Sequence, residues 1–192
     1  MRISLLKDLP DWRAHLAAVE EIFFTSSAVQ SFTDDAHRAR FKARWLGRYL
    51  DHFPGSFFVA LARDPKKWEP VFGQDHAQTE NVIGYLAGCL EDPRNNPLFA
   101  DLGYYAAFGP LCDTYPAHLH INVAAEARSQ GVGAALIEAF AAQCAAANAP
   151  GLHLVTNEGA RNVRFYQQNG FKVLATTLSH GTPVVFMGRK LD

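Results

Sequence analysis

The segment that most restricts the fold of this chain covers 118–140 and reads HLHINVAAEARSQGVGAALIEAF. Its first part, 118–123, reads HLHINV, includes the β-branched Ile121 and Val123, and predicts a strand that ends at Val123. The apolar run over 130–147 predicts a helix, which the sequence NAPG ends. A strand joined to a long apolar helix by a short loop is typical of domains that pack helices on a sheet.

Two glycines stand where this predicted helix begins. Gly131 and Gly133 let the backbone approach a ligand closely, because they lack a Cβ. The first N–H groups of a helix have no partner within the helix, and together with the helix dipole they attract an anion, for which a pyrophosphate is suited. Glycines also occur in ordinary strand-to-helix turns, so this pattern alone leaves both interpretations open.

Helices alternate with strands in the rest of the chain. One amphipathic helix is predicted over 12–23, a second begins with Thr33 as a candidate cap and ends at 54–55, and a short helix covers 159–168. Strands are predicted over 56–62, 82–90, 118–123, 152–156, 171–177 and 184–189, the last two around a turn at 181–183. We expect one domain over 1–192 of the α+β (α/β) class, with a single mixed, mostly antiparallel sheet of about six to seven strands flanked by helices.

Two connections stand out by their length. The polar stretch over 63–81 predicts a long hairpin loop. The stretch over 91–116 has no clear periodicity, and it carries four prolines beside aromatic residues such as Tyr104, Tyr105 and Phe108. Long irregular connections are often functional. Its aromatic side chains either line a pocket or cover the core as a patch.

Composition excludes several classes of function. The chain has 192 residues, with 18 Lys and Arg against 19 Asp and Glu, so it lacks the basic surface of a duplex-binding protein. We expect no nucleic-acid partner, no membrane span and no export signal. Cys89, Cys112 and Cys144 show no metal or redox spacing, and buried thiols in a cytoplasmic protein without metal are expected. The basic residues over 37–48 fit a solvated helix face better than a phosphate site.

A second motif follows the glycine loop, over 165–171, and reads FYQQNGF. Together the two segments resemble the GNAT superfamily of acetyl-CoA-dependent N-acetyltransferases. The family pattern R/Q-x-x-G-x-G/A is matched from Arg128 to Gly133, and the pattern Y-x-x-x-G-F by Tyr166, Gly170 and Phe171. Weaker similarity links 115–121 to acetyltransferase-like domains related to O-GlcNAcases, and the two strand histidines to the arylalkylamine N-acetyltransferase branch.

The resemblance implies a site for acetyl-CoA. The strand over 118–123 would separate from the strand over 152–156 and admit the pantetheine arm, with one backbone N–H polarising the thioester carbonyl. Gly159 stands where the family often has an asparagine that contacts pantetheine, so Asn157 and Asn162 become the nearest candidates. The expected coenzyme-binding residues are Ile121, Asn122, Val123, Arg128, Ser129, Gln130, Gly131, Val132, Gly133, Ala134, Asn157, Asn162 and Tyr166.

Catalysis requires a group that protonates the leaving thiolate and a group that deprotonates the acceptor amine. The resemblance assigns the first role to Tyr166, whose alternative is that of a core aromatic residue. His118 and His120 lie two residues apart and share one face of their strand, so both are candidates for the base. One residue fewer than in the arylalkylamine branch separates them from Gly131, which would turn them to the opposite face as buried histidines.

We therefore expect a cytoplasmic N-acetyltransferase that transfers the acetyl group of acetyl-CoA directly to an amine through a ternary complex. A small-molecule acceptor is favoured over a peptide, and a homodimer is left open. No cysteine matches a catalytic position, so an acetyl-enzyme is not indicated. The alternatives are a non-catalytic acyl-CoA-binding or sensor module with the same fold, and a scaffold for protein association.

Overall fold

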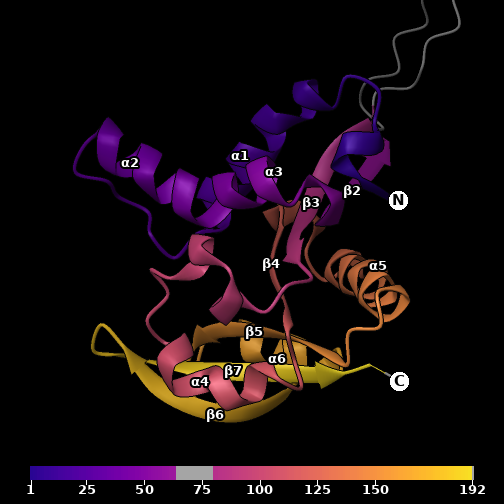
Figure 1. Ribbon diagram of the computed structural model, residues 1–192. Coiled ribbons are helices and arrows are strands. Elements are labelled where there is room, and N and C mark those ends of the chain that lie inside the picture. Colours follow the sequence, from indigo (N-terminus) through magenta and orange to yellow (C-terminus); the bar gives the residue numbers. More distant parts are fainter. Residues whose placement is uncertain (64–79, 192) are drawn as a thin grey trace, which may run out of the picture. The chain divides into compact units, whose positions relative to one another are not determined.

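Seven strands form one mixed sheet in the computed structural model of this chain, which describes residues 1–63 and 80–191 (Figure 1). The strand order is β1-β2-β3-β4-β5-β7-β6. The strands are β1 (Arg2–Leu5), β2 (Phe57–Arg63), β3 (Glu80–Cys89), β4 (Ala117–Val123), β5 (Gly151–Asn157), β6 (Lys172–Ser179) and β7 (Thr182–Lys190). The α-helices are α1 (Leu16–Ser26), α2 (Asp35–Lys42), α3 (Arg48–His52), α4 (Tyr105–Cys112), α5 (Val132–Ala146) and α6 (Asn162–Gln168).

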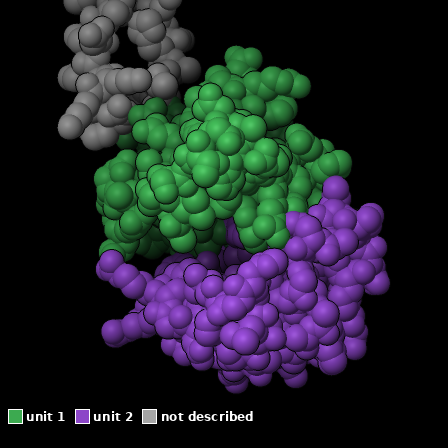
Figure 2. Space-filling model, turned by 90° about the vertical axis from the view of Figure 1, so that its left-hand side faces the viewer, with its two compact units in different colours: residues 1–86, 121–136 green, residues 87–120, 137–192 purple. Residues whose placement is uncertain are grey.

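The chain divides into two compact units (Figure 2). Unit 1 comprises 1–86 and 121–136, and unit 2 comprises 87–120 and 137–192. The boundaries fall within β3, β4 and α5. The hairpin loop predicted over 63–81 lies, for 64–79, outside the described residues.

In unit 1, the two predicted helices are present, but the cap of the second helix and its continuity differ from the prediction. α1 buries Val19, Ile22 and Phe23, which recur at the predicted spacing. The second predicted helix is capped by Asp34 and not by Thr33, because Asp34 Oδ1 accepts a hydrogen bond from the backbone N–H of His37 at 2.6 Å. A π-helical turn at Ala43–Gly47 divides this helix into α2 and α3.

The strand β1 was not predicted. It pairs antiparallel with β2, from Arg2 opposite Leu61 to Leu5 opposite Phe58. Four residues are too few to show a period, so only the pairing with a buried neighbour identifies this strand.

In unit 2, β5, β7 and β6 form an antiparallel set in which every residue of β5 has a partner on β7. The connecting turn is at His180 and Gly181, which both have positive φ, and not at the predicted 181–183. β4 runs parallel to β5, but the two strands pair only at Ala117–Leu152 and His118–His153.

The connection over 91–116 contains a helix that the sequence did not predict. Short 3₁₀ turns at Pro93–Asn95 and Pro97–Phe99 are capped by Asp92 and Asn96, and α4 follows. The sequence did not predict α4 because it contains Gly109 and Pro110, which are both poor helix formers. α4 lies beside the strands of unit 2 (Figure 1). The Phe108 ring of α4 lies 5.4 Å from the Phe186 ring of β7.

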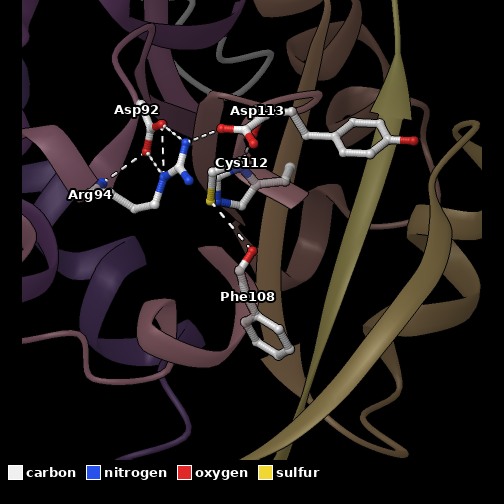
Figure 3. A network of polar contacts seen from close by, with 7 residues as sticks. Asp92, Arg94, Phe108, Cys112 and Asp113 are labelled. Carbon is white, nitrogen blue, oxygen red and sulfur yellow. Dashed lines mark hydrogen bonds and ion pairs between the residues drawn. The ribbon is translucent and has the colours of Figure 1, made fainter. Parts of the chain in front are cut away.

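An arginine between two carboxylates fixes the ends of this connection. Arg94 Nη2 donates to Asp92 Oδ2 and to Asp113 Oδ1, both at 2.5 Å (Figure 3). Asp92 precedes the first 3₁₀ turn and Asp113 follows α4, so one guanidinium joins both ends of the segment. Burial acts to raise the pKa of Asp92, but the hydrogen bonds that Asp92 accepts from the side chain and backbone N–H of Arg94, together with the charge of Arg94, outweigh it and lower this pKa.

The three cysteines are buried and free, as predicted. Burial is the first cause that raises the pKa of Cys89, Cys112 and Cys144 to about 12, so each thiol stays protonated. Within the described ranges, no helix has both the length and the apolar character needed to cross a membrane.

Gly151 is predicted to be indispensable for the packing of unit 2. A Cβ at this position would lie 2.6 Å from Tyr115 Cδ1 and 2.7 Å from the carbonyl oxygen of Thr114. We expect Gly151→Ala to lower the free energy of unfolding by about 1–3 kcal/mol through overpacking, as measured by urea denaturation. Gly103→Ala is the matched control, since a Cβ at Gly103 meets nothing within 4 Å. Equal stability of the two variants would contradict this prediction.

Candidate active site

The loop that leads into α5 lies in unit 1 and carries unsatisfied backbone donors. Ser129 and Gly131 have positive φ, 61° and 79°, and the first bond that enters the helix runs from the N–H of Ala135 to the carbonyl of Gly131. The N–H groups of 129–134 have no hydrogen-bond acceptor among the described residues. A cluster of N–H groups at the start of a 15-residue helix is suited to an anionic group such as a pyrophosphate.

Gly131 is exposed, and a Cβ at this position would meet nothing within 4 Å. The requirement for glycine therefore comes from its φ and not from a close neighbour. The loop residues Ser129 and Gln130 are exposed, whereas Val132 and Gly133 are buried and Ala134 is partly buried. The open surface and the unsatisfied N–H groups together fit the coenzyme pyrophosphate that the sequence motif predicts.

The side chains beside this loop are already engaged. Arg128 Nε donates to the carbonyl of Val123 at 3.1 Å, and its Nη2 donates to Ser26 Oγ at 3.3 Å. Gln130 Nε2 donates to the carbonyl of Glu126 at 2.7 Å. In this conformation Arg128 joins the end of β4 to the end of α1.

The β4 residues expected to meet the pantetheine arm, Ile121, Asn122 and Val123, are all partly exposed. The methyl Cγ2 of Val123 lies 3.4 Å from the Cβ position of Gly84, beside Val132 of α5. Asn122, the preceding residue, donates from Nδ2 to the hydroxyl of Tyr85. Because side chains alternate along a strand, Asn122 points to the face of β4 opposite that of Val123.

The two candidate bases differ in burial. His118 is 3% exposed, and its ring meets that of Phe99 edge-on at 4.5 Å. His120 is partly exposed. Of the two, His120 is therefore the one that a ligand in solution reaches more directly.

A third histidine, His153 on β5, was missed by the sequence analysis. It is fully buried, its Nδ1 donates to the carbonyl of Tyr115 at 2.5 Å, and its Nε2 accepts from the hydroxyl of Tyr105 at 2.9 Å. Its ring also stacks on Phe186 at 4.4 Å and lies 5.6 Å from that of His118. The signal was a histidine in the apolar strand GLHLV, where a polar group needs buried partners.

Tyr166 lies on α6 in unit 2. It is 6% exposed, and its ring meets that of Phe171, from the same sequence motif, edge-on at 5.8 Å. Its hydroxyl has no hydrogen-bond partner among the described residues. Burial raises the pKa of Tyr166, so its phenol remains protonated.

The two asparagines considered in place of Gly159 are exposed. Asn157 is the last residue of β5 and pairs with Val184 of β7, and Asn162 begins α6. Asn162 Oδ1 accepts a hydrogen bond from Thr156 Oγ1 at 3.2 Å, which leaves its amide N–H groups directed elsewhere. Over 1–63 and 80–191, no cluster of His, Cys, Asp and Glu is arranged to hold a metal ion.

Comparison with known families identifies the class of this protein. The family described as acetyltransferase (GNAT) domain matches residues 77–173, which is just over half of the chain. The matched region includes the α5 loop, Tyr166 and the strand histidines. The chain therefore belongs to the GNAT acetyltransferase family.

Solved structures show the same fold at low sequence identity. SsHAT is 22% identical, with a TM-score of 0.66, and the match covers 100% of this chain and 98% of that one. A ribosomal-protein-alanine N-acetyltransferase from Brucella melitensis is 17% identical, with a TM-score of 0.57 and complete coverage of both chains. yncA from Salmonella typhimurium, described as a putative acetyltransferase with its cofactor acetyl-CoA, is 17% identical with a TM-score of 0.56, covering 100% of this chain and 94% of that one.

The buried His153 predicts acid sensitivity. Burial is the main cause that lowers its pKa from 6.5 to about 4. Below pH 6.5 the imidazole of His153 binds a proton in the unfolded chain but stays neutral in the folded protein. The contribution of His153 to the free energy of unfolding is therefore fully present above pH 6.5 and falls as the pH approaches 4. Over that pH range we expect His153 to lower the free energy of unfolding by up to about 3 kcal/mol, as measured by urea denaturation at each pH.

The acid sensitivity of the wild-type protein is compared with that of His153→Gln, because the glutamine side chain does not titrate in this range. This variant is expected to be less stable at neutral pH but to lose less stability on acidification. His52→Gln, at an exposed position on α3, is the control and keeps the wild-type profile. Parallel profiles for wild type and His153→Gln would show that His153 does not cause the acid sensitivity.

Proposed function

We propose that this protein is an N-acetyltransferase that transfers the acetyl group of acetyl-CoA directly to an amine acceptor in a ternary complex. Membership of the GNAT acetyltransferase family supports acetyl transfer from the coenzyme. The observation that carries the proposal is the row of unsatisfied backbone N–H groups over 129–134, placed where this family's motif binds the coenzyme pyrophosphate. The coenzyme is the cosubstrate, and the proposal requires no metal.

Coenzyme binding is assigned to the predicted residues. The N–H groups from Ser129 to Ala134 would hold the pyrophosphate, and the backbone of Ile121 to Val123 would pair with the pantetheine arm. Arg128 would add its charge once its guanidinium leaves Val123 and Ser26. Asn157, Asn162 and Tyr166 of unit 2 are proposed to contact the pantetheine end of the coenzyme.

The transfer needs two proton movements. His120 accepts a proton from the acceptor ammonium, directly or through water, and the amine lone pair then attacks the thioester carbonyl carbon. A backbone N–H of β4 stabilises the oxyanion. As the carbon–sulfur bond breaks, Tyr166 protonates the leaving thiolate, which its unpartnered and protonated hydroxyl supports. His118, buried beside His153, is the second candidate for the base.

The acceptor is proposed to be a small-molecule amine in preference to a peptide. The aromatic segment over 104–108 supports this, because Tyr104 is partly exposed and its ring lies 4.8 Å from that of Tyr105. A cytoplasmic location is part of the proposal, whereas the oligomeric state, for which a homodimer is one option, is not. The buried free thiols are consistent with a reducing compartment.

Coenzyme binding is the first expected outcome. Acetyl-CoA at about one hundred times its Kd is expected to stabilise the folded protein by about 2.7 kcal/mol, measured as a rise in Tm. Gly131→Val is expected to lose at least 10-fold in affinity, because valine does not readily adopt a φ of 79°. Gly181→Val imposes the same φ strain in the β6–β7 turn and is the control that keeps the affinity. Failure of millimolar acetyl-CoA to raise Tm would rule out the proposed function.

Turnover tests the proton-transfer roles. Tyr166→Phe is expected to lower kcat by about 100-fold with little change in coenzyme affinity, as typical for loss of a general acid. Tyr115→Phe removes a hydroxyl from another buried tyrosine of unit 2 and serves as the control. His120→Gln is expected to shift the acid limb of kcat/KM against pH, while His118→Gln should not. The measurement is thiol release from acetyl-CoA with a panel of small amines and short peptides.

An unchanged kcat in Tyr166→Phe would remove that assignment, and an acid limb that moves only in His118→Gln would transfer the role of base to His118. Coenzyme binding without any turnover over the whole panel would favour a non-catalytic acyl-CoA-binding module instead.

A further inference from the structure

Asn122 and Tyr85 form a polar contact in unit 1 that the proposed proton transfers do not use. Asn122 Nδ2, on β4, donates to the hydroxyl oxygen of Tyr85, on β3, at 2.7 Å. Tyr85 is 1% exposed, whereas Asn122 is partly exposed. Asn122 is therefore the member of the pair that a ligand can touch, and Tyr85 lies behind it.

Tyr85 is held in one position. Its ring stacks on the fully buried ring of Phe57, with a centroid distance of 5.3 Å and an interplanar angle of 12°. The preceding residue, Gly84, allows β4 to approach, since a Cβ there would lie 3.2 Å from the carbonyl oxygen of Asn122. Burial raises the pKa of Tyr85, so its hydroxyl stays neutral. The contact thus fixes the orientation of the Asn122 carboxamide.

The contact uses only one of the hydrogen-bonding groups of the Asn122 carboxamide. A carboxamide has two N–H donors and an oxygen that accepts up to two hydrogen bonds. One N–H is given to Tyr85, and Oδ1 and the other N–H have no partner among the described residues. An acceptor and a donor thus stand side by side on a partly exposed group. This arrangement is complementary to another amide, whose carbonyl accepts from the N–H and whose N–H donates to Oδ1.

We propose that the Asn122 side chain binds an amide group of a ligand and that Tyr85 is the residue that positions it. The proposal rests on the proposed function, which places a ligand along 121–123 of β4. Two sources supply such an amide: the pantetheine arm of coenzyme A and the backbone of a peptide acceptor. The chemistry recognised is the same in both cases.

The experiment follows the side-chain amide resonances of Asn122 by NMR in nitrogen-labelled protein. The probes are coenzyme A, the nucleotide part of coenzyme A without its pantetheine arm, and alanyl-alanine amide. We expect the Asn122 resonances to move with coenzyme A but not with the nucleotide alone if pantetheine is the source. They move with alanyl-alanine amide if the acceptor is the source.

Variants test the positioning role. Tyr85→Phe keeps the stacked ring and removes only the hydroxyl, and it is expected to weaken binding of the responding probe about threefold to tenfold, the usual effect of one hydrogen bond. Asn122→Ala should give at least the same loss, and it does not depend on how Tyr85→Phe packs. Tyr49→Phe, at a buried tyrosine of α3 in the same unit, is the control with unchanged affinity.

Each outcome decides a separate question. Coenzyme A binding without any response of Asn122 to coenzyme A or alanyl-alanine amide overturns this inference and leaves the proposed function intact. A response to alanyl-alanine amide in a protein that does not bind coenzyme A overturns the proposed function alone. Unchanged affinities in both Tyr85→Phe and Asn122→Ala also overturn the inference.

Discussion

The arrangement of unit 2 depends on the hydrogen bonds of the neutral His153 imidazole. It donates to the carbonyl of Tyr115 and accepts from the hydroxyl of Tyr105, so it fixes both α4 and the chain that enters β4. Stacking on Phe186 ties the same ring to β7. A buried imidazole can satisfy both nitrogens only in one tautomer and in the neutral form, and this requirement makes its neighbours interdependent.

The candidate active site depends on a different constraint, which is the incomplete hydrogen bonding of the backbone. The first turn of α5 leaves N–H groups without acceptors in the described part of the chain, and β4 pairs with β5 at only two positions. Regular secondary structure satisfies its own backbone, so unsatisfied groups at such places remain available to a ligand. Backbone N–H groups can bind an anion whatever the net charge of the chain. A nearly neutral chain is therefore compatible with an anion site.

Sequence patterns predicted the six longer strands and the helices with clear periodicity, because side chains that face a core recur at fixed spacing. They also located the α5 loop and the motif around Tyr166, since Gly131 and Gly170 have the positive φ that only glycine adopts easily. β1 was missed because of its length, and α4 because of Gly109 and Pro110. His153 was missed because a single polar residue in an apolar strand has no sequence signal for its partners, which lie 38 and 48 residues away.

The sequence by itself determined the class of fold and the position of the α5 loop, because these follow from local spacing and from backbone conformations that few residues tolerate. Its motifs, by resemblance, indicated the family. Only the tertiary structure decided which polar groups meet. It placed Asn122 on the buried hydroxyl of Tyr85, engaged Arg128 with Val123 and Ser26, and buried His118 while leaving His120 partly exposed. Such contacts depend on residues far apart in the chain, whose distances are set by packing and not by local pattern.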